Sequence, residues 1–157
     1  MKFQTKTEKE TRDLGKRLAQ NFLESEKTRK QALVISLEGE LGSGKTTFVQ
    51  GLAQKLGVTN WIKSPTFILM REHVISPNTE KSESEKNYGL TALIHIDCYR
   101  LTKPEALLEI GLRDILKDRN NIILIEWGEK VSKFLPKKTI RIKFKHLKQN
   151  QREITIL

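Results

Sequence analysis

The stretch from residue 34 to residue 48 constrains this chain most, because an apolar run gives way there to glycines and then to Lys-Thr-Thr. Gly39, Gly44, Lys45 and Thr46 occupy every fixed position of the phosphate-loop template G-x-x-x-x-G-K-S/T. The glycines can adopt positive φ, so successive backbone N–H groups can turn towards phosphate oxygens at the start of the following helix. Four fixed positions match by chance in well under about 1% of chains of this length. The stretch therefore predicts nucleotide phosphate binding.

A phosphate loop needs a Mg²⁺ site beside it, and the chain offers candidate ligands. Lys45 is expected to reach the β- and γ-phosphates, and the hydroxyl of Thr46 is expected to bind Mg²⁺. Two apolar strands end in an acid, at Asp97 and Glu126, and strand carboxyl ends gather at the edge where a phosphate loop lies. We prefer Asp97 on the metal and Glu126 near the metal or the attacking water, but the sequence leaves open which acid does which. The alternative for either acid is a helix cap or a surface residue.

The length of 157 residues suits one domain that buries roughly 70% of its unfolded surface. No signal peptide pattern opens the chain, and its longest apolar runs, 32–35 and 122–125, are far too short to span a bilayer. The single cysteine, Cys98, cannot form an internal disulfide, which fits a reducing compartment. We therefore expect a cytoplasmic protein that makes no membrane contact. Three scattered histidines and one cysteine make a zinc site improbable.

The net charge of +10 is unevenly distributed along the chain. Residues 1–30 carry +4 and residues 130–157 carry +8, whereas residues 31–129 carry −2. The basic excess therefore lies away from the expected nucleotide site. It is typical of a surface for nucleic acid or an acidic partner, and equally of an ordinary solvated face, because lysine dominates and aromatic residues are sparse there.

Hydrophobic periodicity predicts alternating helices and strands. In the helix expected at 6–23, Gly15 leaves room for another backbone or a ligand. A capping box at 102–105 predicts that a helix starts there. The further helices are expected at 45–56, 102–108, 114–117 and 129–135, and the strands at 31–38, 67–74, 90–98, 121–126, 140–145 and 154–156.

The polar run 76–89 shows no helical pattern, so strands 67–74 and 90–98 are predicted to form an antiparallel hairpin with a mobile connection. The second strand of such a hairpin can run parallel to the phosphate-loop strand. That arrangement would bring Asp97 to the same sheet edge as Glu126.

Taken together, these segments resemble the TsaE family, also called YjeE, the bacterial ATPase of tRNA threonylcarbamoyladenosine biosynthesis. The likeness covers nearly the whole chain, and the order and spacing of its pieces make it specific. The segments that carry it are 11–15, 39–47, 64–67, 95–101, 109–112 and 125–127.

The resemblance implies a single α/β domain over 1–157, with a P-loop NTPase-like three-layer fold and a mixed parallel and antiparallel sheet. It implies ATP and Mg²⁺ as ligands and the proteins TsaD and TsaB as partners. Those partners attach a threonylcarbamoyl group to the adenosine beside the tRNA anticodon. ATP hydrolysis by this component supports their repeated turnover, and contact with tRNA through the basic surface is a further expectation.

Carried over by position, the resemblance assigns roles to individual residues. Thr46 and Glu126 resemble the Mg²⁺ ligands, with Asp97 a further acidic member, and Lys45, Asp97 and Glu126 form the expected catalytic set. Segment 64–66 resembles a loop that senses the γ-phosphate. The residues expected to bind the nucleotide are Glu8, Thr11, Gly39, Leu41, Gly42, Ser43, Gly44, Lys45, Thr46, Thr47, Thr66, Trp127, Gln151 and Arg152.

Two features of the sequence depart from the family pattern, and three rival functions each lack a required feature or leave one unexplained. Run 76–89 is longer than the family usually carries, and Gly128 and Glu129 stand where a proline often follows the tryptophan. A P-loop small-molecule kinase would need lid arginines, which run 76–89 lacks, and a GTPase would need an Asn-Lys-x-Asp motif. A nucleic-acid-binding module based on the basic C-terminal hairpin leaves the phosphate loop unexplained. Because only Arg100 could act as an arginine finger in cis, slow hydrolysis is expected in isolation.

Overall fold

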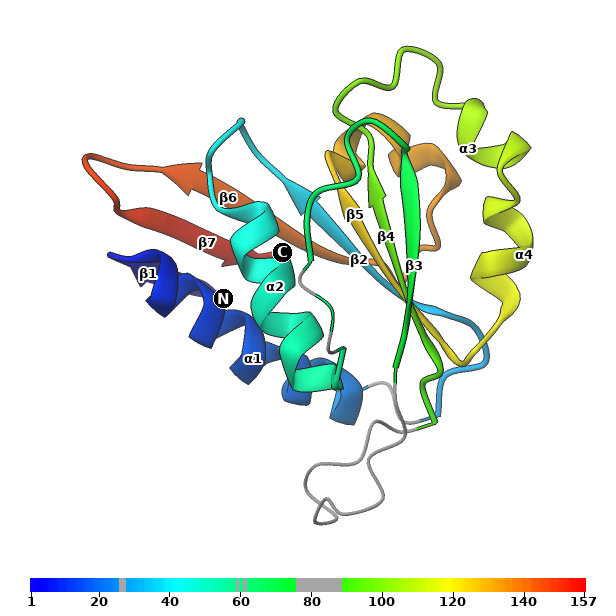
Figure 1. Cartoon of the computed structure of the whole chain (residues 1–157), viewed down its shortest axis with the longest axis horizontal. Coiled ribbons are helices and arrows are strands. Elements are labelled where there is room, and N and C mark those ends of the chain that lie inside the picture. The colour runs from blue at the N-terminus through cyan, green and yellow to red at the C-terminus, as the bar shows by residue number, and fades with distance from the viewer. Residues whose placement is uncertain (26–27, 59, 61, 76–88) are drawn as a thin grey trace.

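The computed structural model describes residues 1–25, 28–58, 60, 62–75 and 89–157 (Figure 1). Seven strands form one sheet in the order β1-β7-β6-β2-β5-β4-β3. The strands are β1 Lys2–Thr5, β2 Leu33–Glu38, β3 Met70–Val74, β4 Ala92–Asp97, β5 Asn121–Glu126, β6 Ile140–His146 and β7 Arg152–Ile156. The helices are α1 Glu8–Ser25, α2 Lys45–Leu56, α3 Ala106–Glu109, α4 Leu112–Lys117 and the 3-10 helix η2 Gly128–Phe134.

The sheet is mixed, as the sequence predicted. The pairs β6–β2, β2–β5 and β5–β4 are parallel, and the pairs β3–β4, β6–β7 and β1–β7 are antiparallel. The predicted hairpin is confirmed, since β3 pairs with β4, and β4 in turn runs parallel to β5. Its connection, 76–88, lies outside the described residues. The parallel register brings the carboxyl ends of β2, β5 and β4 to one end of the sheet (Figure 1).

Helices cover both faces of the parallel strands, which gives the predicted three layers. Helices α1 and α2 pack on one face through apolar side chains such as Leu14 and Phe48, against Leu37 and Leu93 of the sheet. Helices α3, α4 and η2 cover the other face, where Ile96, Leu107 and Val131 belong to a second core cluster. Every residue of β2, β4 and β5 is buried, which explains their nearly continuous apolar sequences.

Glycines allow α1 and α2 to approach closely, and this contact holds the helix that follows the phosphate loop. A Cβ atom at Gly15 would lie 2.4 Å from the carbonyl oxygen of Phe48, and one at Gly51 would lie 1.9 Å from that of Arg12. The sequence left open whether another backbone or a ligand lies against Gly15. In the structure it is the backbone of α2.

Two sequence expectations are corrected. The strand expected from residue 67 begins at Met70, because the Ile68 N–H bonds to the Pro65 carbonyl in a turn and Leu69 adopts a φ of 64°. The capping box at 102–105 does not form: α3 begins at Ala106, and Glu105 at its N-terminus makes no side-chain cap. The predicted helix at 129–135 is the 3-10 helix η2. Within the described residues, no helix is long and apolar enough to cross a membrane.

Candidate functional site

A cavity of about 320 Å³ lies at the carboxyl end of β2, β5 and β4, between the phosphate loop and the loops that follow β4 and β5. It brings together most of the residues expected from the sequence. The expected residues that line it are Glu8, Leu41, Gly42, Ser43, Gly44, Lys45, Thr46, Thr47, Thr66, Asp97, Glu126, Trp127 and Arg152.

Three expected nucleotide-binding residues are not part of the cavity lining. The fully buried hydroxyl of Thr11 donates to the carbonyl of Thr7 and lies 2.8 Å from the hydroxyl of Thr5. Gly39 starts the loop with a φ of 133°, where a Cβ would lie 2.2 Å from a backbone oxygen of β6. Gln151 is exposed in the turn between β6 and β7. Ser64 and Tyr99 line the cavity as well.

The phosphate loop has the backbone that glycine makes accessible. Gly42 and Gly44 adopt φ values of 74° and 99°, both in the left-handed region. Gly44 is the residue before α2, and no side chain in the described part of the chain caps that helix start. The first N–H groups of α2 therefore point towards the cavity end of the helix, where an anion would be stabilised.

The Lys45 ammonium is already held at the loop. Its Nζ donates to the carbonyl oxygens of Gly39 and Glu40 at 2.7 and 2.8 Å, and it lies 4.3 Å from the ring centroid of Trp127. Burial lowers the pKa of Lys45 from its ordinary value, and the nearby carboxylates, Glu126 foremost, oppose that shift. The lysine is thus a desolvated donor, fixed in position before any ligand arrives.

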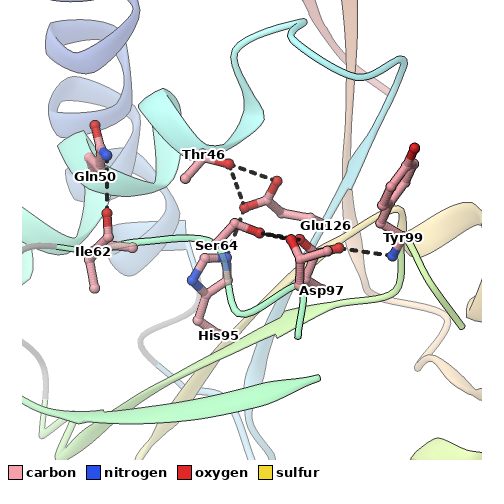
Figure 2. A network of polar contacts seen from close by, with 9 residues as sticks. Thr46, Gln50, Ile62, Ser64, His95, Asp97, Tyr99 and Glu126 are labelled. Atoms are coloured by element: carbon pink, nitrogen blue, oxygen red, sulfur yellow. Dashed lines mark hydrogen bonds and ion pairs between the residues drawn. The ribbon is translucent and has the colours of Figure 1, made fainter. Parts of the chain in front are cut away.

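The side chains of Glu126 and Thr46 are hydrogen-bonded to each other beside the phosphate loop. The Thr46 hydroxyl lies 2.9 Å from one carboxylate oxygen of Glu126 and 3.0 Å from the other (Figure 2). Nε2 of His95 lies 2.9 Å from Oε1 of the same carboxylate. Glu126 is only 3% exposed, so these contacts hold a desolvated carboxylate in place.

Asp97 connects β4 to the segment before β3. Its Oδ2 accepts hydrogen bonds from the Thr66 hydroxyl at 2.8 Å and from the Ser64 hydroxyl, and its Oδ1 accepts the Tyr99 N–H at 2.8 Å (Figure 2). Asp97 is also buried, and it lies beside Glu126 in the register of β4 against β5. The two acids, from neighbouring strands, therefore face one cavity, as the strand-end pattern predicted.

Sequence reasoning missed two parts of the site. Tyr99 lies in segment 95–101, and the resemblance assigns it no role, yet its ring centroid lies 5.1 Å from that of Trp127 at the cavity wall. The contact of His95 with Glu126 was also missed, since it depends on strand register. The neighbouring thiol of Cys98 is fully buried, and burial raises its pKa to about 12, so it stays protonated and is a poor nucleophile.

The donor set fits Mg²⁺ better than a softer metal. It consists of one hydroxyl, Thr46, and two carboxylates, Asp97 and Glu126, all lining the cavity. In the part of the chain that the structure describes, no three His, Cys, Asp or Glu side chains gather as a metal site of their own. Mg²⁺ characteristically uses one or two carboxylates together with waters and ligand phosphates.

Comparison with known proteins agrees with this architecture. The family described as "Threonylcarbamoyl adenosine biosynthesis protein TsaE" matches residues 5–154. Proteins named tRNA threonylcarbamoyladenosine biosynthesis protein TsaE are among the relatives. The one from Treponema pallidum is 37% identical over 123 residues, covering 78% of this chain and 80% of the relative. The one from Rickettsia typhi is 32% identical over 151 residues, covering 96% and 90%.

A solved structure gives the same result at the level of the fold. The crystal structure of Bacillus subtilis YdiB superposes with a TM-score of 0.69 at 28% identity, covering 99% of this chain and 83% of that one. Its likeness identifies the fold as P-loop NTPase-like. With the match over residues 5–154, it establishes that this chain belongs to the TsaE family.

Proposed function

We propose that this protein is a Mg²⁺-dependent ATPase of tRNA threonylcarbamoyladenosine biosynthesis, with the cavity below the phosphate loop as its catalytic site. The observation that carries the proposal is the contact of the Thr46 hydroxyl with both carboxylate oxygens of Glu126. These residues come from α2 and β5, 80 positions apart in the chain. They lie where a phosphate-loop enzyme needs its metal ligands.

The triphosphate binds through the backbone N–H groups of 42–46 and the ammonium of Lys45. In the free protein that ammonium bonds to two loop carbonyls, so it turns towards the phosphates by exchanging one set of acceptors for another. Glu8 and Arg152, which also line the cavity, are assigned to nucleotide contacts. Arg152 is 7% exposed, and its Nε has no partner among the described residues, which supports an anionic ligand.

Mg²⁺ would be held by Thr46 and Glu126, with Asp97 as a further acid. A Mg²⁺ ion held there would supply positive charge against the phosphates during transfer. The chain's own part is to orient these donors: Glu126 is fixed by Thr46 and His95, and Asp97 by Ser64 and Thr66. Because Asp97 bonds to both hydroxyls of segment 64–66, we propose that this segment responds to the γ-phosphate.

Partner proteins are needed to complete the site in this proposal. Arg100 does not line the cavity; its guanidinium carbon lies 4.3 Å from the ring centroid of Phe67. Exposed apolar side chains occur in the cavity lining at Leu41 (72% exposed), and directly after the lining residue Thr66 at Phe67 (83%) and Ile68 (54%). Exposed apolar side chains of this kind favour protein docking. We assign that docking to TsaD and TsaB, and we place the protein in the cytoplasm with the tRNA.

The test is an ATPase assay of the purified chain, with and without TsaD and TsaB. Slow turnover alone and clear stimulation by the two partners are expected. A Lys45→Ala variant should show neither, because it loses the phosphate-directed ammonium. Rapid turnover that ignores the partners would refute the partner-dependent mechanism, and unchanged turnover in Lys45→Ala would refute the site.

Direct contact with tRNA is a second candidate function, and the basic side chains of β6 that face the solvent favour it. Arg141, Lys143 and Lys145 alternate with buried residues and are exposed. Arg141 bonds to Glu38 at 2.6 Å, which leaves two lysines for phosphate contacts. Filter binding of tRNA at two salt concentrations tests this, since affinity from phosphate contacts falls steeply with salt. Lys143→Glu should weaken binding, and an affinity insensitive to salt and to this variant would rule the surface out.

A further inference from the structure

We infer that His95 is a positioning residue for the metal-binding carboxylate of Glu126, an inference that rests on the proposed ATPase function and deepens it. His95 does not line the cavity, so it acts through Glu126 rather than on the nucleotide. Its imidazole fixes the orientation in which this carboxylate meets Mg²⁺.

The position of His95 is unusual for a polar side chain. It lies in the middle of β4, and its exposed fraction is 0%. Side chains alternate along a strand, so Ile94 and Ile96 face the layer of α3 and α4. Leu93, on the same side as His95, belongs to the apolar core under α1 and α2. Packing alone would place an aliphatic residue there, so the imidazole needs another explanation.

The hydrogen-bond geometry supplies one. Nε2 of His95 lies 2.9 Å from Oε1 of Glu126, and the Thr46 hydroxyl approaches the same carboxylate from α2. An ionised carboxylate offers only acceptors, so Nε2 carries the proton and donates it. Two donors from different elements thus fix the carboxylate, and its remaining lone pairs are available to the cavity that Glu126 lines.

The other ring nitrogen shows that this arrangement is costly. Nδ1 of His95 is buried and has no hydrogen-bond partner among the residues that the structure describes. A buried polar atom without a partner destabilises the folded state, so an aliphatic side chain would serve stability better. A histidine that orients a metal-binding carboxylate accounts for the cost, since partners of this kind typically change metal affinity or activity by about 10–100-fold.

The neighbouring strand provides a matched control. His73 of β3 is 6% exposed, and its Nε2 is also buried without a partner in the described part of the chain. It lies opposite Leu93, one diagonal step from His95, and no contact with Glu126 is found for it. Replacing either histidine removes a buried imidazole from the same region, but only the change at His95 releases the carboxylate.

The experiment measures ADP affinity in EDTA and across a Mg²⁺ titration, for His95→Leu, His95→Gln and His73→Leu. ADP affinity in EDTA should stay within about twofold of the parent protein in all three. The Mg²⁺ concentration at half-maximal effect should rise by about 10-fold or more in His95→Leu. It should be largely restored in His95→Gln, whose amide can donate from the place of Nε2, and unchanged in His73→Leu.

A measurement on the metal-free, nucleotide-free protein adds an independent readout. Nitrogen-15 NMR of the parent protein should show a proton on Nε2 of His95, and this readout is available even if His95→Leu does not fold. The Nδ1-protonated tautomer, an equal Mg²⁺ shift in His73→Leu, or no shift in His95→Leu would each overturn the inference. If the parent protein shows no Mg²⁺-dependent nucleotide binding, the proposed function itself fails, and the tautomer result distinguishes that failure from a misassigned His95.

Discussion

Two cavities lie at opposite ends of β2, and they differ in what fixes their charges. The cavity at the carboxyl end, about 320 Å³, is lined by Lys45, Asp97 and Glu126, all less than 5% exposed. The cavity at the amino end, about 270 Å³, lies between 28–34 and 136–139. Its lysines, Lys30 and Lys138, are exposed, and no carboxylate is among its lining residues.

Neither volume nor positive charge distinguishes the proposed site from the other cavity, whereas the burial of its charged groups does. Exposed lysines stay hydrated, so their electrostatic interactions with bound ions and with other side chains are weak. Buried charges cost free energy, and the protein tolerates them only where hydrogen bonds and opposite charges hold them, as at Lys45 and Glu126. Charged groups that are buried and held in this way are suited to bind phosphate and metal, with Lys45 exchanging loop carbonyls for phosphate oxygens.

The largest expected effect is a loss of ATP turnover, and it distinguishes the two cavities directly. Lys45→Ala should lower partner-stimulated ATP turnover by about 10²–10³-fold, because it removes a fixed donor to the phosphates. Lys138→Ala removes an equal charge from the other cavity and should leave turnover within about twofold. Steady-state ATPase assays with TsaD and TsaB measure both. Comparable losses in the two variants would mean that net charge, rather than preorganisation, governs turnover.

A smaller effect distinguishes the two acids within the carboxyl-end cavity. Glu126→Gln should raise the Mg²⁺ concentration needed for nucleotide binding by about 10–100-fold, because it removes a charged ligand next to Thr46. Asp97→Asn should lower turnover more than it changes the Mg²⁺ requirement, since Asp97 also holds Ser64 and Thr66. Mg²⁺ titrations of nucleotide binding and of turnover separate these outcomes. A larger Mg²⁺ shift in Asp97→Asn would reverse the assignment of the direct ligand.

The third effect concerns the backbone of the loop. Gly44→Ala should cost about 1–2 kcal/mol of unfolding free energy, because Gly44 has a φ of 99°. Its new Cβ would also lie 2.7 Å from Arg152, which lines the cavity, so nucleotide affinity should fall. Gly111→Ala is the control, with a φ of 86° and no atom within 4 Å of the new Cβ. Urea unfolding and nucleotide titration should show similar stability losses but reduced affinity only in Gly44→Ala; equal affinities would mean that Arg152 does not contribute to binding.

The sequence predicted those parts of the fold and site that local pattern determines. The bounds of α2, Lys45–Leu56, follow from the phosphate-loop template and from Gly57, which ends the helix with a φ of 86°. The convergence of Asp97 and Glu126 was predictable because both end apolar strands that pair in parallel. Each of these features depends on residues adjacent in the chain or on one general rule of sheet topology.

Features that depend on register or on turn geometry could not be predicted in this way. His95 meets Glu126 only because β4 and β5 align with Asp97 opposite Glu126, which no periodicity encodes. The strand expected from residue 67 begins only at Met70, because a turn closed by the hydrogen bond from the Ile68 N–H to the Pro65 carbonyl precedes it. Thr11, expected by resemblance to bind the nucleotide, is fully buried and bonded to the Thr7 carbonyl, a contact that a motif does not reveal.

The smallest expected effect tests the cost of burying Lys45 itself. Because burial lowers its pKa, the unfolded chain binds more protons than the folded one between that lowered pKa and 10.5, so this lysine makes unfolding free energy rise with pH there. Below that window the charged form lowers the unfolding free energy by a constant amount, so Lys45→Met should stabilise the free protein at pH 7.

Urea unfolding at pH 7 and pH 10, with Lys138→Met as the exposed control, measures this effect. Other lysines titrate over the same range, but their contribution cancels when each variant is compared with the parent protein. Lys138→Met should match the parent at both pH values, whereas the advantage of Lys45→Met should shrink at pH 10. If the two variants behave alike, burial of Lys45 does not lower the unfolding free energy. The two cavities would then differ only in that one of them is lined by carboxylates.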